Sequence, residues 1–311
     1  MFSTSGALGS SIFHALWRDI PKINDDNVDE DESFLISFPE IPSSPEFPWW
    51  HLPPASRSYK KGDHDFESFR MTMLANMKSW GIVYNTFEGL EGVYIDHMKK
   101  QIGHDRVWAV GPLLPDKHGP MASARTGSSE APPDDLRASK TATLSEGQMS
   151  ALVGALKLSK VGYIISMKAS DSSSFEEDVA AGQGFVVKGW APQLAILEHR
   201  AVGSYLTHCG WNSILEGIAS GVMMLAWPMG ADQFANATLL VDELGVGKRV
   251  CEGGPEIVPD SNELARLLDE SLSGDLPERV KVKELRDGAM KAVKEGTSRD
   301  LDMFVKIVCE V

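Results

Sequence analysis

The sequence predicts an α/β protein built from two domains. In the second half of the chain, short β-branched and aromatic runs alternate with helical patterns, and turns rich in glycine or proline separate them. A length of 311 residues suits two domains and allows a sizeable hydrophobic core. Residues 116–143 are rich in Pro, Gly and Ser and hold no β-branched run, so we interpret them as a flexible linker.

The linker sets the expected domain boundaries. Residues 1–115 form part of an N-terminal Rossmann-like domain, and 144–295 form a C-terminal Rossmann-like domain. Residues 296–311 are expected to form a terminal helix that packs back on the first domain. The second domain should open with a helix over 145–158 and a buried strand over 161–167 (VGYIISM), and it should end in amphipathic helices at 261–272 and 277–294.

Three strand–turn–helix units follow one another between these elements. The strands are expected at 185–188, 202–208 and 224–227, and the turns at Gly189, Cys209-Gly210 and 228–231. Pro192 suits the first position of the helix after the first turn. The second turn leads into a helix over 211–220, and Asp232 and Gln233 open the third helix.

The polar residues of these units gather where strands end, which is the edge at which open α/β sheets bind ligands. Asn212 and Ser213 fall in the first turn of a predicted helix, where free N–H groups and the helix dipole attract an anion. Trp190 lies on a turn where it can stack on a base. Asp232 and Gln233 offer a carboxylate and an amide to two vicinal hydroxyls. We therefore expect these residues to bind a base, a diphosphate and a sugar.

Segment 190–233 (WAPQLAILEHRAVGSYLTHCGWNSILEGIASGVMMLAWPMGADQ) resembles the signature box of plant UDP-dependent glycosyltransferases. These are family 1 enzymes of the GT-B fold that glycosylate small secondary metabolites, and WAPQ, HCGWNS, the Glu and DQ stand in register with their pattern. The resemblance implies two Rossmann-like domains that face a cleft. One departure is Met223, where the family usually has Pro, and we expect only a small effect on entry into the strand.

The resemblance also implies a donor site. Its residues are Trp190, Ala191, Gln193, His208, Gly210, Trp211, Asn212, Ser213, Glu216, Asp232 and Gln233. The implied roles are uracil stacking for Trp190, ribose binding for Gln193 and Glu216, phosphate binding for His208, Asn212 and Ser213, and sugar contact for Trp211, Asp232 and Gln233. Trp211 and Gln233 fit the pattern associated with UDP-glucose. UDP-glucose would be a co-substrate, with no cofactor and no metal.

The same resemblance extends to 2–21, 82–91 and 107–115, which look like consecutive pieces of the family's N-terminal domain. Two parts of the family pattern are missing. We expect the N-terminal domain to be truncated, without the His that deprotonates the acceptor and the Asp that orients it. We also expect the C-terminal domain to lack its first strand, which is central in a doubly wound sheet. That sheet should carry an unpaired gap, or its neighbours should close up.

The catalytic residues are therefore unknown. His51, in WWHLPP, and His14, within a predicted helix, are weak candidates for a replacement base. Residues 48–50 and 66–73 are expected to line what remains of the acceptor pocket, and a flavonoid or other hydrophobic phenol is the expected acceptor. The expected reaction is transfer of glucose to its hydroxyl with inversion. The alternative is a catalytically dead UDP-binding remnant, or a truncated or mis-spliced fragment. A general dinucleotide enzyme is disfavoured because no G-x-G-x-x-G follows a strand.

Charge and composition limit the partners. The formal net charge of −14 argues against nucleic acid and anionic membrane, and part of it lies in the acidic run 25–32, interpreted as a solvated loop. No apolar run is long enough to span a membrane. The 3 cysteines are few and widely spaced, which is typical of reduced thiols in the cytoplasm. We expect a cytoplasmic monomer.

Overall fold

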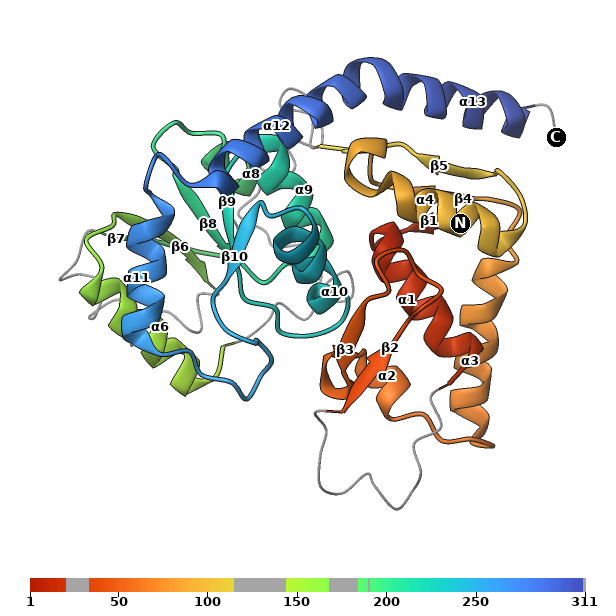
Figure 1. The fold of residues 1–311 in the computed structure, drawn as a ribbon, viewed down its shortest axis with the longest axis horizontal. Helices are drawn as coiled ribbons and strands as arrows, with labels where there is room; N and C mark the ends of the chain where they lie inside the picture. Colours follow the sequence, from red (N-terminus) through yellow and green to blue (C-terminus); the bar gives the residue numbers. More distant parts are fainter. Residues whose placement is uncertain (21–33, 115–143, 168–183, 190, 310–311) are drawn as a thin grey trace.

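The computed structural model describes residues 1–20, 34–114, 144–167, 184–189 and 191–309. The linker, the acidic run 25–32 and Trp190 lie outside these residues. Two α/β halves lie side by side, and the last helix runs across the first half (Figure 1). Each half is built around short parallel strands with helices packed against them.

The N-terminal half has a three-stranded parallel sheet in the order β1-β4-β5, with a separate antiparallel pair β2-β3. Its elements are β1 (Phe2–Ser3), α1 (Ala7–Arg18), β2 (Leu35–Ser37), β3 (Glu46–Pro48), the 3-10 turn η2 (Trp49–His51), α2 (Pro54–Arg57), α3 (His64–Met77), β4 (Ile82–Tyr84), α4 (Glu88–Ile102) and β5 (Val107–Ala109). His14 lies within α1, as predicted.

A buried carboxyl group organises this half. Glu91 is fully buried on α4, and its Oε1 accepts a hydrogen bond of 2.9 Å from the backbone N–H of Leu8 in the first turn of α1. No side chain caps α1 locally, so this long-range contact satisfies one of its free N–H groups. Burial raises the pKa of Glu91, and the N–H groups of Leu8 and Ala7 oppose that shift.

The C-terminal half contains the three predicted strand–turn–helix units. Its elements are α6 (Glu146–Leu158), β6 (Tyr163–Met167), β7 (Gly184–Lys188), α8 (Gln193–Leu197), β8 (Ser204–Thr207), α9 (Trp211–Ser220), β9 (Met223–Ala226), α10 (Gln233–Thr238), the π-turn η5 (Leu239–Glu243), β10 (Gly247–Arg249), α11 (Ser261–Ser271), α12 (Pro277–Lys291), the π-turn η6 (Ala292–Gly296) and α13 (Thr297–Cys309).

Local signals account for most of these boundaries. Ser145 and Gln148 form a capping box at the start of α6, and Gly221 ends α9 in the left-handed conformation with φ 66°. Several boundaries differ from the prediction: β7 begins at Gly184 rather than at 185, and β8 covers only Ser204–Thr207 of the expected 202–208. The third strand begins at Met223 rather than at 224, and Pro192 is the N-cap of α8 rather than its first residue.

The strands of the C-terminal half form two separate sheets. β7 pairs with β6, and β8 pairs with β9, which pairs with β10, all in parallel. Among the described strands β6 and β8 do not pair with each other. Of the two outcomes expected for a missing central strand, the described residues agree with the gap. β8 is half-exposed over most of its length, whereas every residue of β9 is buried.

One core cluster still joins the two sheets. Leu206 of β8, Leu225 of β9 and Ile165 of β6 belong to the same apolar cluster, to which α6 and α11 contribute. The other face of the β6–β7 pair is open, because the paired residues Ile164 and Phe185 are 51% and 66% exposed. Parallel sheets are normally covered on both faces.

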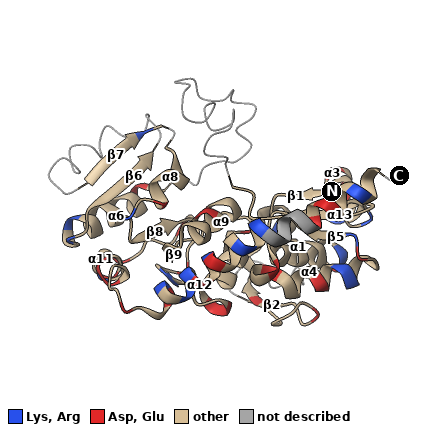
Figure 2. Cartoon of the chain, turned by 90° about the horizontal axis from the view of Figure 1, so that it is seen from above, with Lys and Arg blue, Asp and Glu red and all other residues tan. Residues whose placement is uncertain are grey.

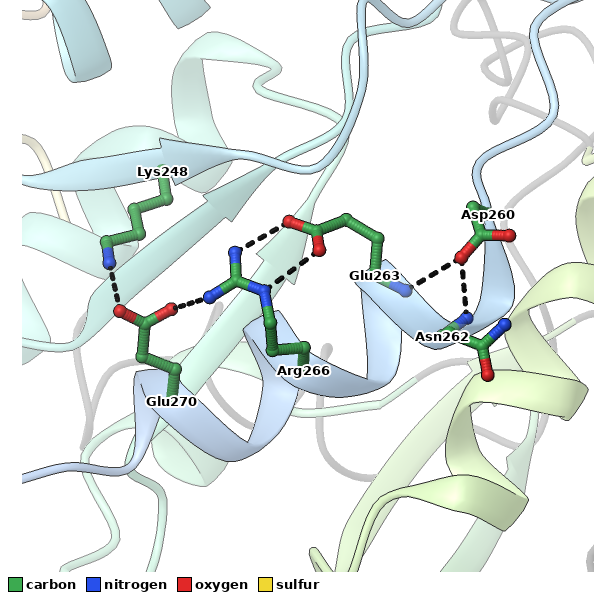
Figure 3. A network of polar contacts seen from close by, with 6 residues as sticks. All are labelled: Lys248, Asp260, Asn262, Glu263, Arg266 and Glu270. Atoms are coloured by element: carbon green, nitrogen blue, oxygen red, sulfur yellow. Dashed lines mark hydrogen bonds and ion pairs between the residues drawn. The ribbon is translucent and has the colours of Figure 1, made fainter.

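A polar network ties α11 to the sheet beneath it (Figure 3). Asp260 caps the helix by accepting hydrogen bonds of 3.0 and 2.9 Å from the N–H groups of Asn262 and Glu263. Further along, Glu270 joins Arg266 of the same helix to Lys248 of β10 through ion pairs of 2.7 and 2.8 Å. Acidic and basic residues are likewise interspersed along α4, α11 and α12 (Figure 2).

The terminal helix returns to the N-terminal half, as predicted. Phe304 and Ile307 of α13 pack against a small core of Val83, Trp108 and Val110, and Phe304 meets Trp108 edge to face at 5.2 Å. Asp300 accepts a hydrogen bond of 3.2 Å from the N–H of Ala109. Within the described part of the chain, no helix combines the length and the apolar character that crossing a membrane requires.

Candidate functional site

The turn between β8 and α9 is held in a tight conformation. Cys209 adopts a left-handed φ of 64°, and its side chain is fully buried. Its N–H donates to Thr207 Oγ1 at 3.1 Å, and its carbonyl accepts from Asn236 Nδ2 at 3.0 Å. The amide of Asn236 on α10 thus fixes the turn from outside, a role that sequence reasoning did not assign. Cys209 packs in the turn, as expected, and burial raises its pKa to about 12.

The N-terminus of α9 is open. Gly210 is its N-cap, with φ −62° and ψ 143°, and no side chain caps the helix there. Asn212 is exposed and Ser213 is half-buried in the first turn. Free N–H groups, the positive end of a ten-residue helix and two polar side chains therefore meet at one place. Such a place suits a phosphate group.

Two of the predicted ribose ligands are in contact. Gln193, the first residue of α8, donates from Nε2 to Glu216 Oε2 of α9 at 2.8 Å and lies 3.5 Å from Ser213 Oγ. The carbonyl of Ala191 accepts from the N–H of Gln193 at 2.8 Å, which begins the helical turn. The ends of the first two strand–turn–helix units therefore converge, as their shared position at the carboxyl ends of parallel strands requires.

The third turn carries Asp232 and Gln233. Gln233 accepts with Oε1 from the N–H groups of Met229 and Gly230, at 2.8 and 3.1 Å, so its carbonyl oxygen holds the turn closed. Only its NH₂ group is left to face a ligand. Asp232 is half-buried beside this turn.

His208 and Asp232 come within electrostatic reach of each other. Partial burial lowers the pKa of His208, and the carboxylate of Asp232 acts in the opposite direction. The second and third turns therefore meet as well. An imidazole that can gain a proton beside an anionic ligand is a suitable phosphate partner.

Trp211 has a structural contact that the sequence did not reveal. Its side chain is only 4% exposed, and its indole Nε1–H donates at 2.8 Å to the backbone carbonyl of Asn85, which follows β4 in the other half. The one hydrogen-bond donor of the indole is thus used between the two halves. Any contact of Trp211 with a sugar must come from its backbone or from the ring itself.

A cavity of about 460 Å³ lies against this region. Its lining includes Ser10 and His14 of α1, His51 of η2 and Asp232 and Phe234 at the start of α10. The two weak candidates for a base and one predicted sugar contact therefore share one cavity. Met73 of α3 also lines it.

The tryptophans beside His51 have other roles. Trp49 is buried in the core and stacks on Phe34 at 5.6 Å, and Trp50 meets Phe234 edge to face at 5.3 Å. Neither is among the residues that line this cavity, whereas Met73 of the expected segment 66–73 is. Phe234 was missed, although it directly follows the predicted sugar-binding pair.

Comparisons with known proteins agree with this geometry. The family model of UDP-glucoronosyl and UDP-glucosyl transferases matches residues 166–251, which contain all three turns. UDP-glycosyltransferase 89B2 of Stevia rebaudiana is 47% identical over 94% of this chain and 66% of its own length. Flavonol 3-O-glucosyltransferase UGT89B1 of Arabidopsis thaliana is 42% identical over 99% of this chain and 68% of its own length.

The chain belongs to the plant UDP-glycosyltransferase family. A crystal structure of Arabidopsis thaliana UGT89C1 with UDP-L-rhamnose superposes with a TM-score of 0.70 at 36% identity, covering 99% of this chain and 66% of that one. The architecture of this UDP-glycosyltransferase chain is therefore GT-B, as the resemblance implied. The chain spans about two thirds of the length of the relatives it matches.

Proposed function

We propose that this UDP-glycosyltransferase chain binds UDP-glucose at the three turns and transfers glucose, with inversion, to a hydroxyl group of a small phenol in the adjoining cavity. The observation that carries the proposal is the position of Asp232, which lines the cavity and also acts electrostatically on His208. A donor site and an acceptor cavity that share a residue place their ligands next to each other. A flavonol is the favoured acceptor class, because one relative is named as a flavonol glucosyltransferase.

The donor is assigned group by group. The diphosphate lies at the open N-terminus of α9, bound by its N–H groups together with His208, Asn212 and Ser213. These groups stabilise the charge that develops on UDP as it leaves. The ribose is bound by Glu216 and Gln193, which already contact each other at 2.8 Å. No metal is assigned, so we expect chelation with EDTA to leave turnover unchanged.

The sugar is the less constrained part of the donor. Asp232 and the NH₂ group of Gln233 are assigned to glucose hydroxyls. Arabidopsis thaliana UGT89C1, which is similar to this chain in structure, was crystallised with UDP-L-rhamnose. UDP-L-rhamnose is therefore the competing donor. Parallel assays with UDP-glucose and UDP-L-rhamnose decide between the two.

A binding-only role is the second candidate, and two observations favour it. Among the strands described, β6 and β8 do not pair, and no base has been assigned for the acceptor hydroxyl. The loss of a general base typically lowers turnover by about 10²–10⁴-fold. An acidic phenol needs less assistance, so we expect turnover to be slow and to favour acidic acceptors.

Calorimetric titration of the chain with UDP tests the donor site. Glu216→Ala should weaken UDP binding by about 10- to 100-fold, because it removes a charged partner of the ribose hydroxyls. Glu284→Ala is the matched control, since Glu284 is an exposed carboxylate on α12. UDP binding that is equal in both variants would contradict the assignment.

Turnover is measured separately. The wild-type chain is incubated with UDP-glucose and quercetin, a flavonol, and the product is detected by mass spectrometry. The anomeric configuration of the product, determined by NMR, tests inversion. Saturable UDP binding without any product would favour the binding-only role.

A further inference from the structure

His51 is held rigidly between the two halves of the molecule. Its ring stacks on Phe234 with centroids 4.0 Å apart and an interplanar angle of 11°, and Trp50 meets it edge to face at 4.0 Å. The residue is only 9% exposed. Phe234 belongs to α10, directly after Asp232 and Gln233. The helix that carries the sugar contacts therefore also supports the imidazole.

The imidazole has an unused polar atom. His51 Nε2 is buried and has no hydrogen-bond partner among the described residues. Leaving a buried nitrogen unpaired is unfavourable, and such atoms in folded proteins call for an explanation. His51 also lines the cavity of about 460 Å³. Nε2 itself is covered, so a turn of the imidazole toward the cavity is what lets a ligand there supply the missing partner.

The rest of the cavity suits an aromatic ligand with few polar groups. Apolar side chains from several elements form much of its wall, namely Ile12, Phe13, Phe47, Leu52, Met73 and Met77. The volume lies in the range of sites for small organic molecules, which use apolar walls and a few well-placed polar groups to fix orientation. His51 contributes a polar side chain to this wall.

The charge state of His51 indicates whether it binds a ligand or acts as a general base. Burial, and secondarily the positive charge of Arg249, lower the pKa of His51 to about 4. The imidazole is therefore neutral at pH 7 and carries one N–H donor and one acceptor nitrogen. A base this weak is far from the optimum for removing a proton from a phenol at neutral pH. Its chemistry fits hydrogen bonding to a hydroxyl, which can donate or accept and so suits either tautomer.

We propose that His51 is a specificity-determining residue that binds a hydroxyl group of an aromatic acceptor through Nε2, and that it is not the general base. This inference rests on the proposed function for the identity of the ligand as an acceptor. It revises the sequence-based role of His51, because the same atom that made it a candidate base is placed for recognition.

A matched ligand pair tests the proposal on the full chain. 2-Naphthol and 2-methylnaphthalene have nearly the same shape and differ in one hydroxyl group, so the ratio of their dissociation constants measures hydroxyl recognition. His51→Phe keeps a ring against Phe234 and removes Nε2. It should weaken 2-naphthol binding by about 2- to 12-fold, the range of one hydrogen bond, and leave 2-methylnaphthalene binding unchanged.

Two further variants make the result specific. His51→Gln places an amide near the position of Nε2 and should keep the preference for 2-naphthol. His97→Phe replaces another buried histidine, which does not line the cavity, and should leave the ratio unchanged. If His51→Phe does not give a cooperative unfolding transition, His51→Leu replaces it. Equal weakening of both ligands, or no change for 2-naphthol, would overturn the proposal.

Failure of the proposed function can be distinguished from failure of the recognition site. UDP binding and transfer from UDP-glucose to quercetin are measured on the same preparations. A His51-dependent preference for 2-naphthol without any transfer would sustain the recognition site and reject the transferase. Transfer of glucose without a His51-dependent preference for 2-naphthol would sustain the transferase and reject the recognition site.

Discussion

At the scale of single residues, hydrogen bonds within the protein modify the roles implied by the sequence. Trp211 donates its indole N–H to Asn85, and Gln233 uses its carbonyl oxygen to close its own turn. Gln193 and Glu216, in contrast, are in contact, which agrees with the ribose role proposed for both. The residue types of the proposed donor site were readable from the sequence, because the motif has a fixed spacing. The atoms left free for a ligand were not, because long-range contacts use some of them.

The buried imidazole of His51 predicts a pH-dependent contribution to stability. Its pKa is about 4 in the folded chain and near 6.5 in the unfolded chain, so the unfolded state binds more protons between these values. The folded state therefore loses stability as pH falls from 6.5 to 4. The difference in unfolding free energy between wild type and His51→Phe should fall by about 1–3 kcal/mol over that range.

Denaturant unfolding of both proteins at several pH values measures this difference. The subtraction is needed because Glu91 and Glu243, whose pKa values burial raises, change stability in the opposite direction over the same range. A difference that stays constant from pH 4 to 6.5 would show that His51 titrates normally in the folded chain.

At the scale of elements, several helix ends followed from local signals in the sequence, although α3, which Asp63 caps, was not predicted. Ser145 begins α6 and Asp260 begins α11, because side chains of these types accept hydrogen bonds from free N–H groups. The start of α1 had no such signal. Its N–H groups are bound by Glu91, which is 83 residues away in sequence from Leu8. Only the tertiary structure could identify that cap.

Removal of the local cap of α11 has a predictable effect. Asp260→Ala should lower the free energy of unfolding by about 1 kcal/mol, because the N–H groups of Asn262 and Glu263 lose their acceptor. Asp260→Asn should retain most of the stability. Asp275→Ala, in the exposed turn before α12, is the control. Thermal and denaturant unfolding provide the measurement, and equal stability of Asp260→Ala and Asp275→Ala would contradict the role of the cap.

At the scale of the whole molecule, the strands that the structure describes leave the C-terminal sheet split, unlike a complete doubly wound sheet. β8 borders the gap and is half-exposed, whereas β9 lies between β8 and β10 and is fully buried. A strand edge with free N–H and C=O groups is normally paired or covered. The open face at Ile164 and Phe185 adds exposed apolar surface beside the gap.

Amide hydrogen exchange followed by NMR tests this arrangement. We expect the amides of β8 that point away from β9 to exchange well before those of β9, because local opening is not needed to expose them. The same contrast is expected between the free edge of β6 and its edge paired with β7. Equal protection across β8 and β9 would show that the gap is closed in solution.

The sequence by itself determined the α/β class, the three strand–turn–helix units and the family, and it supplied the residues proposed for the donor site. All of these depend on local periodicity and on motifs read at fixed spacing. The tertiary structure decided which partners those residues meet: Asn85 for Trp211, Phe234 for His51, and no partner strand between β6 and β8 among the described residues. These contacts join segments distant in the chain, and the geometry that brings them together is set by packing of the whole core rather than by any local pattern.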